Sequence, residues 1–199
     1  MSGMRRRLIL ASASPRRAEL LREIGVPFEV IPSEIEEAWP PGPPRQAVTA
    51  LALAKCRSVA ERLAAPAVVL GADTAVVLDG RVLGKPDSPE EARRMLRELR
   101  GRQHEVITGV AVVEVPAGRE TAAAVVTRVL MREYGEAEID QYVATGEPFD
   151  KAGAYAIQET GGALVARVEG CYTNVIGLPL TTTRRLLEAC GAISSQGAS

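Results

Sequence analysis

The sequence LILASASPRRAELL at residues 8–21 predicts a buried β-strand that leads directly into an α-helix. The apolar run at 8–10 is typical of a buried strand. Ser14 suits the N-cap position of the helix, and Pro15 suits its first turn. The helix then places apolar residues on one face and ends near Gly25. A strand followed at once by a helix is the repeating unit of α/β folds.

Two arginines, Arg16 and Arg17, fall in the first turn of this expected helix. The helix dipole disfavours a cation there by about 0.3–1 kcal/mol. Free backbone N–H groups at a helix N-terminus attract anions, and guanidinium groups add paired hydrogen bonds to phosphate oxygens. Ser12 and Ser14 are small enough to let a phosphate approach the backbone. The pattern therefore favours a phosphate site, and the alternative is that both arginines form ordinary ion pairs at the surface.

The rest of the chain alternates between strand and helix patterns and predicts an α/β fold with a mixed sheet. The expected strands cover residues 28–31, 67–70, 75–78, 81–83, 106–115, 121–132 and 164–168. The expected helices cover residues 45–63, 89–99, 136–143 and 181–189. The proline-rich segment at 32–44 and the glycine- and alanine-rich segment FDKAGAYAIQETGG at 149–162 are expected to be loops.

The composition is that of a soluble globular protein, with 46% hydrophobic and 25% charged residues. A formal net charge of −1 gives no global attraction to nucleic acid or to anionic membranes. Cys56, Cys171 and Cys190 are widely spaced, so reduced thiols in a cytoplasmic protein are expected rather than disulfides or a zinc site. His104, the single histidine, has charged neighbours and is expected at the surface, which argues against a histidine base.

Lys55 and Asp73 are the two charged residues whose positions are hardest to explain as surface charges. Lys55 falls on the inward stripe of the helix at 45–63, where an unpaired ammonium is costly. Its replacement by leucine is therefore expected to stabilise the ligand-free protein. Asp73 in GADT is expected at the end of the strand at 67–70, where α/β proteins present polar groups to a crevice. The alternative for Asp73 is a turn-forming aspartate.

Further charged groups complete a set suited to polyphosphate chemistry. Lys85 lies in LGKP, and Glu34, Glu36 and Glu37 form an acidic cluster on the proline-rich loop. Taken singly, each is typical of a solvated surface. Together, carboxylates that hold a divalent metal and cations that neutralise phosphate are what metal-assisted hydrolysis of a polyphosphate requires. The chain has neither GxxxxGK[ST] nor GxGxxG, which excludes a P-loop and a Rossmann dinucleotide site.

Four segments together resemble the Maf family of nucleoside triphosphate pyrophosphatases. They are LASASPRRAELL at 10–21, GADTAVVLDGRVLGKP at 71–86, DKAGAYAIQ at 150–158 and NVIGLPL at 174–180. The resemblance implies a long bent mixed sheet whose flanking helices form two lobes around a cleft, as in the inosine triphosphate pyrophosphatases. It implies a single domain over residues 1–191 and a tail at 192–199. It also implies hydrolysis of a nucleoside triphosphate to the monophosphate and pyrophosphate, with Mg²⁺ or Mn²⁺, by a cytoplasmic and often dimeric protein.

The resemblance also implies roles for individual residues. Asp73 matches the catalytic proton acceptor, and Glu37 and Asp73 match the residues at the metal. The implied substrate-binding residues are Ser12, Arg16, Arg17, Lys55, Thr74, Lys85 and Gln158. Of these, Arg16, Thr74 and Gln158 match the positions linked to substrate choice. AYAIQ is similar to the branch that acts on dTTP and UTP, whereas the branch that prefers 7-methyl-GTP has a serine–glutamate pair there.

Gln158 offers a specific hypothesis about base recognition. A carboxamide carries both a donor and an acceptor, so it matches the adjacent carbonyl and imide N–H of uracil or thymine. We therefore expect dTTP and UTP to react faster than CTP, and the alternative is that Gln158 only braces its loop. A 7-methyl-GTP-type pyrophosphatase, a phosphatase or kinase-like transferase, and a non-catalytic nucleotide-binding regulator of septum formation remain alternatives. No nucleic-acid or membrane partner is expected.

Overall fold

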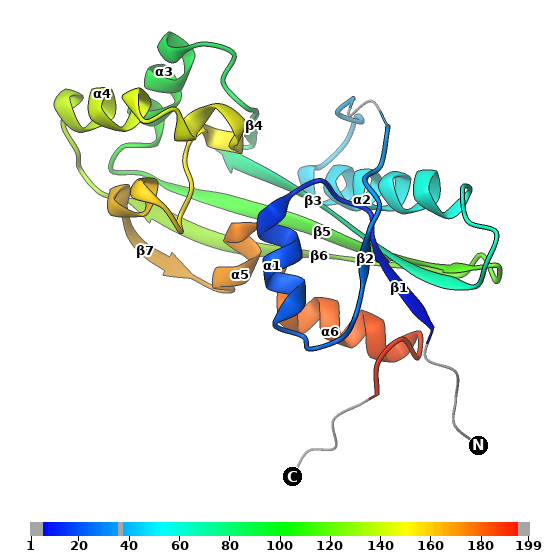
Figure 1. Ribbon diagram of the computed structural model, residues 1–199. Coiled ribbons are helices and arrows are strands. Elements are labelled where there is room, and N and C mark those ends of the chain that lie inside the picture. Colours follow the sequence, from blue (N-terminus) through cyan, green and yellow to red (C-terminus); the bar gives the residue numbers. More distant parts are fainter. Residues whose placement is uncertain (1–5, 36–37, 195–199) are drawn as a thin grey trace. The chain divides into compact units, whose positions relative to one another are not determined.

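A computed structural model describes residues 6–35 and 38–194 (Figure 1). The strands are β1 (Arg7–Leu10), β2 (Glu29–Val30), β3 (Ala67–Leu78), β4 (Arg81–Leu83), β5 (Gln103–Val115), β6 (Glu120–Met131) and β7 (Val165–Glu169). The α-helices are α1 (Pro15–Arg22), α2 (Pro44–Ala60), α3 (Pro89–Leu99), α4 (Glu136–Ala144), α5 (Tyr172–Ile176) and α6 (Leu180–Ala189). Three short 3-10 helices are η1 (Glu147–Asp150), η2 (Ala152–Ala154) and η3 (Thr160–Leu164).

The described strands form one mixed sheet. Its hydrogen-bonded order is β2-β1-β3-β5-β6-β7, and β4 pairs with β3 outside that path. Strand β1 is parallel to both β2 and β3, whereas β3–β4 and β6–β7 are antiparallel pairs. The α/β class and the mixed sheet expected from the sequence are therefore confirmed.

The chain divides into two compact units, and the boundary between them falls inside three long strands. Unit 1 comprises Met1–Asp73, Thr108–Val125 and Gly177–Ser199, and unit 2 comprises Thr74–Ile107 and Val126–Ile176. Strands β3, β5 and β6 therefore each contribute one end to unit 1 and the other end to unit 2.

Helix α2 covers one face of the strands of unit 1. Its inward residues and those of β1, β3 and β5 form a cluster of Ile9, Ala11, Ala52, Cys56, Val59, Ala67, Val69, Ala111 and Val113. The strand residues in this cluster are two positions apart, as the alternation of a β-strand requires. The intervening residues, such as Leu8 and Leu10, are also buried. Both faces of these strands are thus covered, and Figure 1 shows α1 and α6 on the side away from α2.

Two glycines let α2 lie unusually close to the sheet. A Cβ atom on Gly71 of β3 would lie 2.7 Å from the carbonyl oxygen of Ala52, and one on Gly109 of β5 would lie 2.4 Å from the backbone of Val48. Any larger residue at either position would push the helix outward. The glycine of GADT is therefore required by the packing of α2, whose residues lie directly above it.

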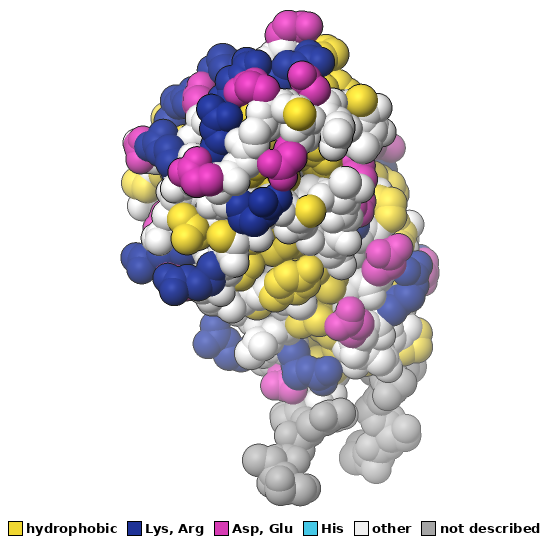
Figure 2. Space-filling model, turned by 90° about the vertical axis from the view of Figure 1, so that its left-hand side faces the viewer, with side chains coloured by type: hydrophobic (Ala, Val, Ile, Leu, Met, Phe, Trp, Pro, Cys, Tyr) yellow, Lys and Arg dark blue, Asp and Glu magenta, His cyan; other side chains and the backbone are white. Residues whose placement is uncertain are grey.

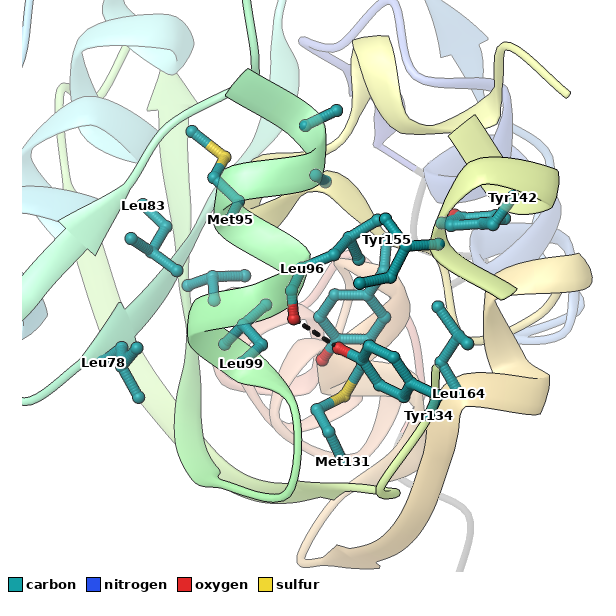
Figure 3. Close-up of a cluster of buried hydrophobic side chains, with 14 of the residues drawn as sticks. Leu78, Leu83, Met95, Leu96, Leu99, Met131, Tyr134, Tyr142, Tyr155 and Leu164 are labelled. Carbon is teal, nitrogen blue, oxygen red and sulfur yellow. Dashed lines mark hydrogen bonds between the residues drawn. The ribbon is translucent and has the colours of Figure 1, made fainter. Parts of the chain in front are cut away.

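The core of unit 2 is built around α3 (Figure 3). Apolar residues at the four- and three-residue spacing of a helix, among them Met95, Leu96 and Leu99, pack on strands β3 to β7 and on α4. Three tyrosines enter this core. The hydroxyl of Tyr134 donates a hydrogen bond to the Leu96 carbonyl oxygen over 2.7 Å, which satisfies the donor inside the apolar cluster.

The outer surface of unit 2 carries charges of both signs. Figure 2 shows basic and acidic side chains interspersed on the face it presents. The arginines on and around α3 pair with carboxylates, as in Arg81–Glu98, Arg93–Asp140, Arg94–Glu91 and Arg97–Glu136. Among the described residues, no helix combines the length and the apolar character needed to cross a bilayer.

Three local expectations were wrong. Strand β3 runs without interruption from Ala67 to Leu78, so Asp73 lies within a strand and not at its end. The helix α5 was not expected, and the strand expected at 28–31 is reduced to two exposed residues. The dipeptide Asp79-Gly80 is typical of a two-residue hairpin turn and predicts one between the strands expected at 75–78 and 81–83. This hairpin is confirmed, since both residues have the positive φ (50° and 77°) that the favoured turn requires.

His104 is buried in unit 2, which corrects the expectation that it lies at the surface. It is only 2% exposed, and its Nε2 lies 2.7 Å from the hydroxyl oxygen of Tyr155 in a hydrogen bond. The two rings meet edge to face at 5.4 Å. Its Nδ1 has no hydrogen-bond partner among the residues that the structure describes. Its charged sequence neighbours misled the prediction, because alternation along β5 turns His104 inward while Gln103 is exposed.

This burial predicts a loss of stability in mild acid. Burial lowers the pKa of His104 to about 4, whereas an unfolded histidine titrates near pH 6.5. Between these values the unfolded state binds the proton and the native state does not. The contribution of His104 to the free energy of unfolding should therefore be complete above about pH 6.5. The free energy of unfolding should fall by about 3 kcal/mol as the pH drops from 6.5 to 4.

Urea unfolding at several pH values measures this loss. In His104→Gln the side chain still reaches a polar partner but does not titrate, so the decline between pH 6.5 and 4 should be clearly smaller. An equal decline in the wild type and His104→Gln would contradict the prediction.

Candidate active site

A buried ion pair joins α2 to β3 in unit 1. The ammonium of Lys55 donates a hydrogen bond to Oδ1 of Asp73 over 2.7 Å, and the two side chains are only 6% and 9% exposed. Gly71 lies two residues before Asp73, on the same face of β3, and allows α2 to approach. Lys55 lies between Ala52 and Cys56 of α2, the two residues that a Cβ on Gly71 would meet at 2.7 Å. The packing that Gly71 permits thus brings the two charges together.

This pair corrects the expectation that Lys55 is an unpaired buried cation. The expected inward position is confirmed, since the residue is 4% exposed. Its charge is balanced, however, by the carboxylate of Asp73. Removing one member of a buried pair leaves the other charge without compensation, which is strongly destabilising. The expected stabilisation by Lys55→Leu is therefore withdrawn.

Asp73 and Thr74 are consecutive residues of β3, so their side chains point to opposite faces of the sheet. Asp73 shares the face of Gly71, toward α2. Thr74 shares the face of Val76, which packs in the core of unit 2. Strand β3 therefore presents on opposite faces the two residues that the resemblance matches to proton transfer and to substrate choice.

The N-terminus of α1 adds a second cluster in unit 1. The Ser14 side chain caps the helix by accepting a hydrogen bond from the Arg17 backbone N–H, as predicted. The guanidinium of Arg17 donates to the Gly177 carbonyl oxygen over 2.9 Å and to Ser12 Oγ over 3.3 Å. Arg17 thus ties the SASPRR segment to the NVIGLPL segment. Arg16 is half-buried in the same first turn, where no acidic residue offsets the helix dipole.

In unit 2, the segment with Lys85 is tied to the segment that leads to Gln158. The Gly153 backbone N–H donates to the Gly84 carbonyl oxygen over 2.9 Å. Gly153 has φ of 71°, and a Cβ there would lie 2.9 Å from a methyl carbon of Val76. Only glycine adopts this positive φ and leaves room for Val76 without strain. The candidate residues Lys85 and Gln158 are both exposed, on segments held by this contact.

The donors in the described residues fit a divalent metal only in part. They contain no group of three or more His, Cys, Asp or Glu side chains that could hold an ion. Asp73 offers one carboxylate, whereas Glu37, the other expected ligand, lies outside the described residues. Mg²⁺ is commonly held by one or two carboxylates together with substrate phosphates. With one carboxylate among the described residues, a Mg²⁺ ion would therefore take most of its ligands from phosphate oxygens and water.

The candidate residues divide between the two compact units. Ser12, Arg16 and Arg17 lie around the start of α1, and Lys55 pairs with Asp73, all in unit 1. Thr74, Lys85 and Gln158 belong to unit 2. Two buried residues near these candidates were not expected from the sequence. Lys151 pairs with Asp150, and the hydroxyl of Tyr142 accepts a hydrogen bond from the Ala156 backbone N–H. The position of Lys151 within DKAGAYAIQ could have indicated it as a candidate residue, whereas no local sequence pattern indicates Tyr142.

Comparison with known proteins adds a family relationship to this geometry. The family described as "Maf-like protein" matches residues 7–190. The chain is 56% identical over 186 residues to a dTTP/UTP pyrophosphatase of Moorella thermoacetica, covering 93% of this chain and 95% of the relative. It is 53% identical over 188 residues to a dTTP/UTP pyrophosphatase of Anaeromyxobacter dehalogenans, covering 93% and 94%. A solved Ham1 protein of Staphylococcus aureus is 18% identical with a TM-score of 0.45, over 65% of this chain and 75% of that one.

Proposed function

Since this chain belongs to the Maf-like protein family, we propose that it hydrolyses dTTP and UTP to the nucleoside monophosphate and pyrophosphate. The observation that carries the proposal is identity above 50%, over nearly the full length of both chains, to proteins named dTTP/UTP pyrophosphatase. The buried Lys55–Asp73 pair and the arginines of α1 supply groups suited to this chemistry.

In the proposed reaction, a water oxygen attacks the α-phosphorus and the bond from that phosphorus to the bridging oxygen breaks. Asp73 accepts the proton of the attacking water, and pyrophosphate leaves. Lys55 holds the Asp73 carboxylate in a fixed position through its 2.7 Å hydrogen bond. A divalent cation, Mg²⁺ or Mn²⁺, held by Asp73 and Glu37, would neutralise phosphate charge when bound.

The remaining candidate residues divide between the phosphates and the base. The residues proposed to bind phosphate oxygens are Ser12, Arg16, Arg17, Lys55 and Lys85. Arg17 also donates a hydrogen bond to Ser12 Oγ. Thr74 and Gln158 are proposed to take part in base selection. Guanidinium and ammonium groups are donors only, which suits phosphate. A carboxamide both donates and accepts, which suits a pyrimidine edge.

The proposal extends to the organisation of the protein. Residues 1–191 would form one functional domain built from parts of both compact units, followed by a tail at 192–199. A cytoplasmic location agrees with the three free cysteines, Cys56, Cys171 and Cys190. Assembly as a homodimer is part of the proposal. A nucleic-acid or membrane partner is not.

Pyrophosphate release from a panel of nucleotides with Mg²⁺ or Mn²⁺ tests the function. We expect dTTP and UTP to give the highest kcat/KM, with little effect of the 2′-hydroxyl. CTP should react at least about tenfold more slowly, because it leaves a polar group of the site unpaired. In Gln158→Ala the UTP:CTP ratio should fall toward one, whereas Gln141→Ala, at an exposed position of α4, should keep it.

Other outcomes would favour the alternatives. A clear preference for 7-methyl-GTP would move the chain to the other branch of the family. Release of no pyrophosphate from any nucleotide in the panel would favour a non-catalytic binding role. An unchanged UTP:CTP ratio in Gln158→Ala would mean that Gln158 only braces its loop.

A further inference from the structure

The loop that carries Gln158 is folded tightly on itself in unit 2. A Cβ on Gly161 would lie 2.7 Å from the Ala156 carbonyl oxygen, and one on Gly162 would lie 2.4 Å from the Ile157 carbonyl oxygen. The end of the loop therefore presses on its beginning, where only glycine fits. The intervening residues 158–160 form an exposed tip. A closed loop of this kind fixes the position of the Gln158 backbone.

Tyr142 of α4 holds the base of this loop. Its hydroxyl oxygen accepts a hydrogen bond from the Ala156 backbone N–H over 3.1 Å. A Cβ on Gly161 would lie 2.5 Å from the same oxygen, so both ends of the loop meet at the tyrosine hydroxyl. Tyr142 is 3% exposed and belongs to the core cluster, and Figure 3 shows its ring among the core side chains. Burial raises the pKa of Tyr142, so the hydroxyl stays neutral at ordinary pH.

We propose that Tyr142 is a positioning residue for base selection: its hydroxyl fixes the backbone of the loop 156–162, and with it the position from which the Gln158 side chain reaches the base. The inference rests on the proposed function, in which Gln158 recognises the pyrimidine. An amide can distinguish uracil from cytosine only if its donor and acceptor cannot exchange places. A fixed backbone two residues before Gln158 places the amide within hydrogen-bond distance of the base, where the contacts with the base hold its donor and acceptor in one order.

The same core offers a matched control. Tyr134 is also 3% exposed, belongs to the same cluster, and makes one hydroxyl hydrogen bond to backbone, to Leu96 of α3. Tyr134→Phe and Tyr142→Phe therefore each remove one buried hydroxyl and one hydrogen bond. Only Tyr142→Phe releases the loop that carries Gln158. A general loosening of the core would affect the two variants alike.

The experiment compares kcat/KM for UTP and CTP in the wild type and both variants, alongside thermal melts. Loss of one neutral hydrogen bond corresponds to about fivefold in an equilibrium. We therefore expect the UTP:CTP ratio to fall about fivefold in Tyr142→Phe and to stay at the wild-type value in Tyr134→Phe. Deuterium exchange of the Ala156 amide should be faster in Tyr142→Phe alone. Gly162→Ala, which disturbs the loop without touching the hydroxyl, should also lower the ratio.

The outcomes separate this inference from the function on which it rests. A wild-type ratio in Tyr142→Phe, while Gln158→Ala loses the preference, would overturn the role of Tyr142 and leave the proposed function intact. An equal fall in Tyr134→Phe would also overturn it, because the effect would then come from the core. A wild-type protein without a preference for UTP over CTP would overturn both proposals.

Discussion

Asp73→Asn is expected to lower kcat for UTP hydrolysis by about 10²-fold or more, which is the usual contribution of a general base. Asparagine has the shape of aspartate but cannot take the proton of the attacking water. Its side-chain oxygen can still accept the hydrogen bond that Lys55 now donates to Asp73. The Lys55 ammonium loses its counter-charge, however, so the variant should fold with a lower melting temperature than the wild type. Circular dichroism with a melting curve checks that the loss of turnover is not a loss of structure.

Asp79→Asn provides the matched control for this experiment. Asp79 follows the last residue of β3, but it is exposed and pairs with Arg102. Asparagine also tolerates the positive φ found there. The control should turn over UTP at the wild-type rate. Near-normal turnover in Asp73→Asn would show that another group accepts the proton.

Lys55→Leu is expected to lower the free energy of unfolding of the ligand-free protein by about 3–5 kcal/mol, the cost of breaking a buried ion pair by removing one partner. The carboxylate of Asp73, whose side chain is 9% exposed, would remain in the interior without its cation. Urea unfolding at neutral pH measures the change. Lys85→Leu, at an exposed lysine, should change the free energy of unfolding by no more than about 0.5 kcal/mol.

A double variant separates the charge from the packing. In Lys55→Leu combined with Asp73→Asn no uncompensated charge remains, so part of the lost stability should return. The coupling between the two sites, obtained from the four proteins of the cycle, should be clearly different from zero. Additive effects would mean that the two charges do not depend on each other for stability. Increased stability in Lys55→Leu would restore the expectation drawn from the sequence alone.

Most of the fold could be predicted because strong local signals coincide with the tertiary structure. Ser14 caps α1, Ser88 caps α3, and Asp79-Gly80 closes a hairpin, as their residue types indicate. The interruption expected in β3 was wrong for a physical reason. Glycine, alanine and aspartate, the first three residues of GADT, are depleted in strands, but pairing with neighbouring strands and packing under α2 outweigh local preference.

The candidate site could be predicted as a set of residue types but not as a set of contacts. The inward position of Lys55 followed from helical periodicity, whereas its partner, 18 residues away on β3, depends on how α2 packs. The burial of His104 depends on the direction in which β5 turns that residue. The anchoring of the Gln158 loop by Tyr142 joins segments that no local pattern connects.

The alternation of Asp73 and Thr74 along β3 has an evolutionary consequence. Asp73, proposed to act in hydrolysis, faces α2, whereas Thr74, proposed to act in base selection, faces the core that supports the Gln158 loop, so the two proposed functions are built on different packing surfaces. Mutations that retune the loop for a new nucleobase need not disturb the ion pair beneath α2. A lineage with this strand could therefore diversify its substrates while inheriting its hydrolytic chemistry unchanged.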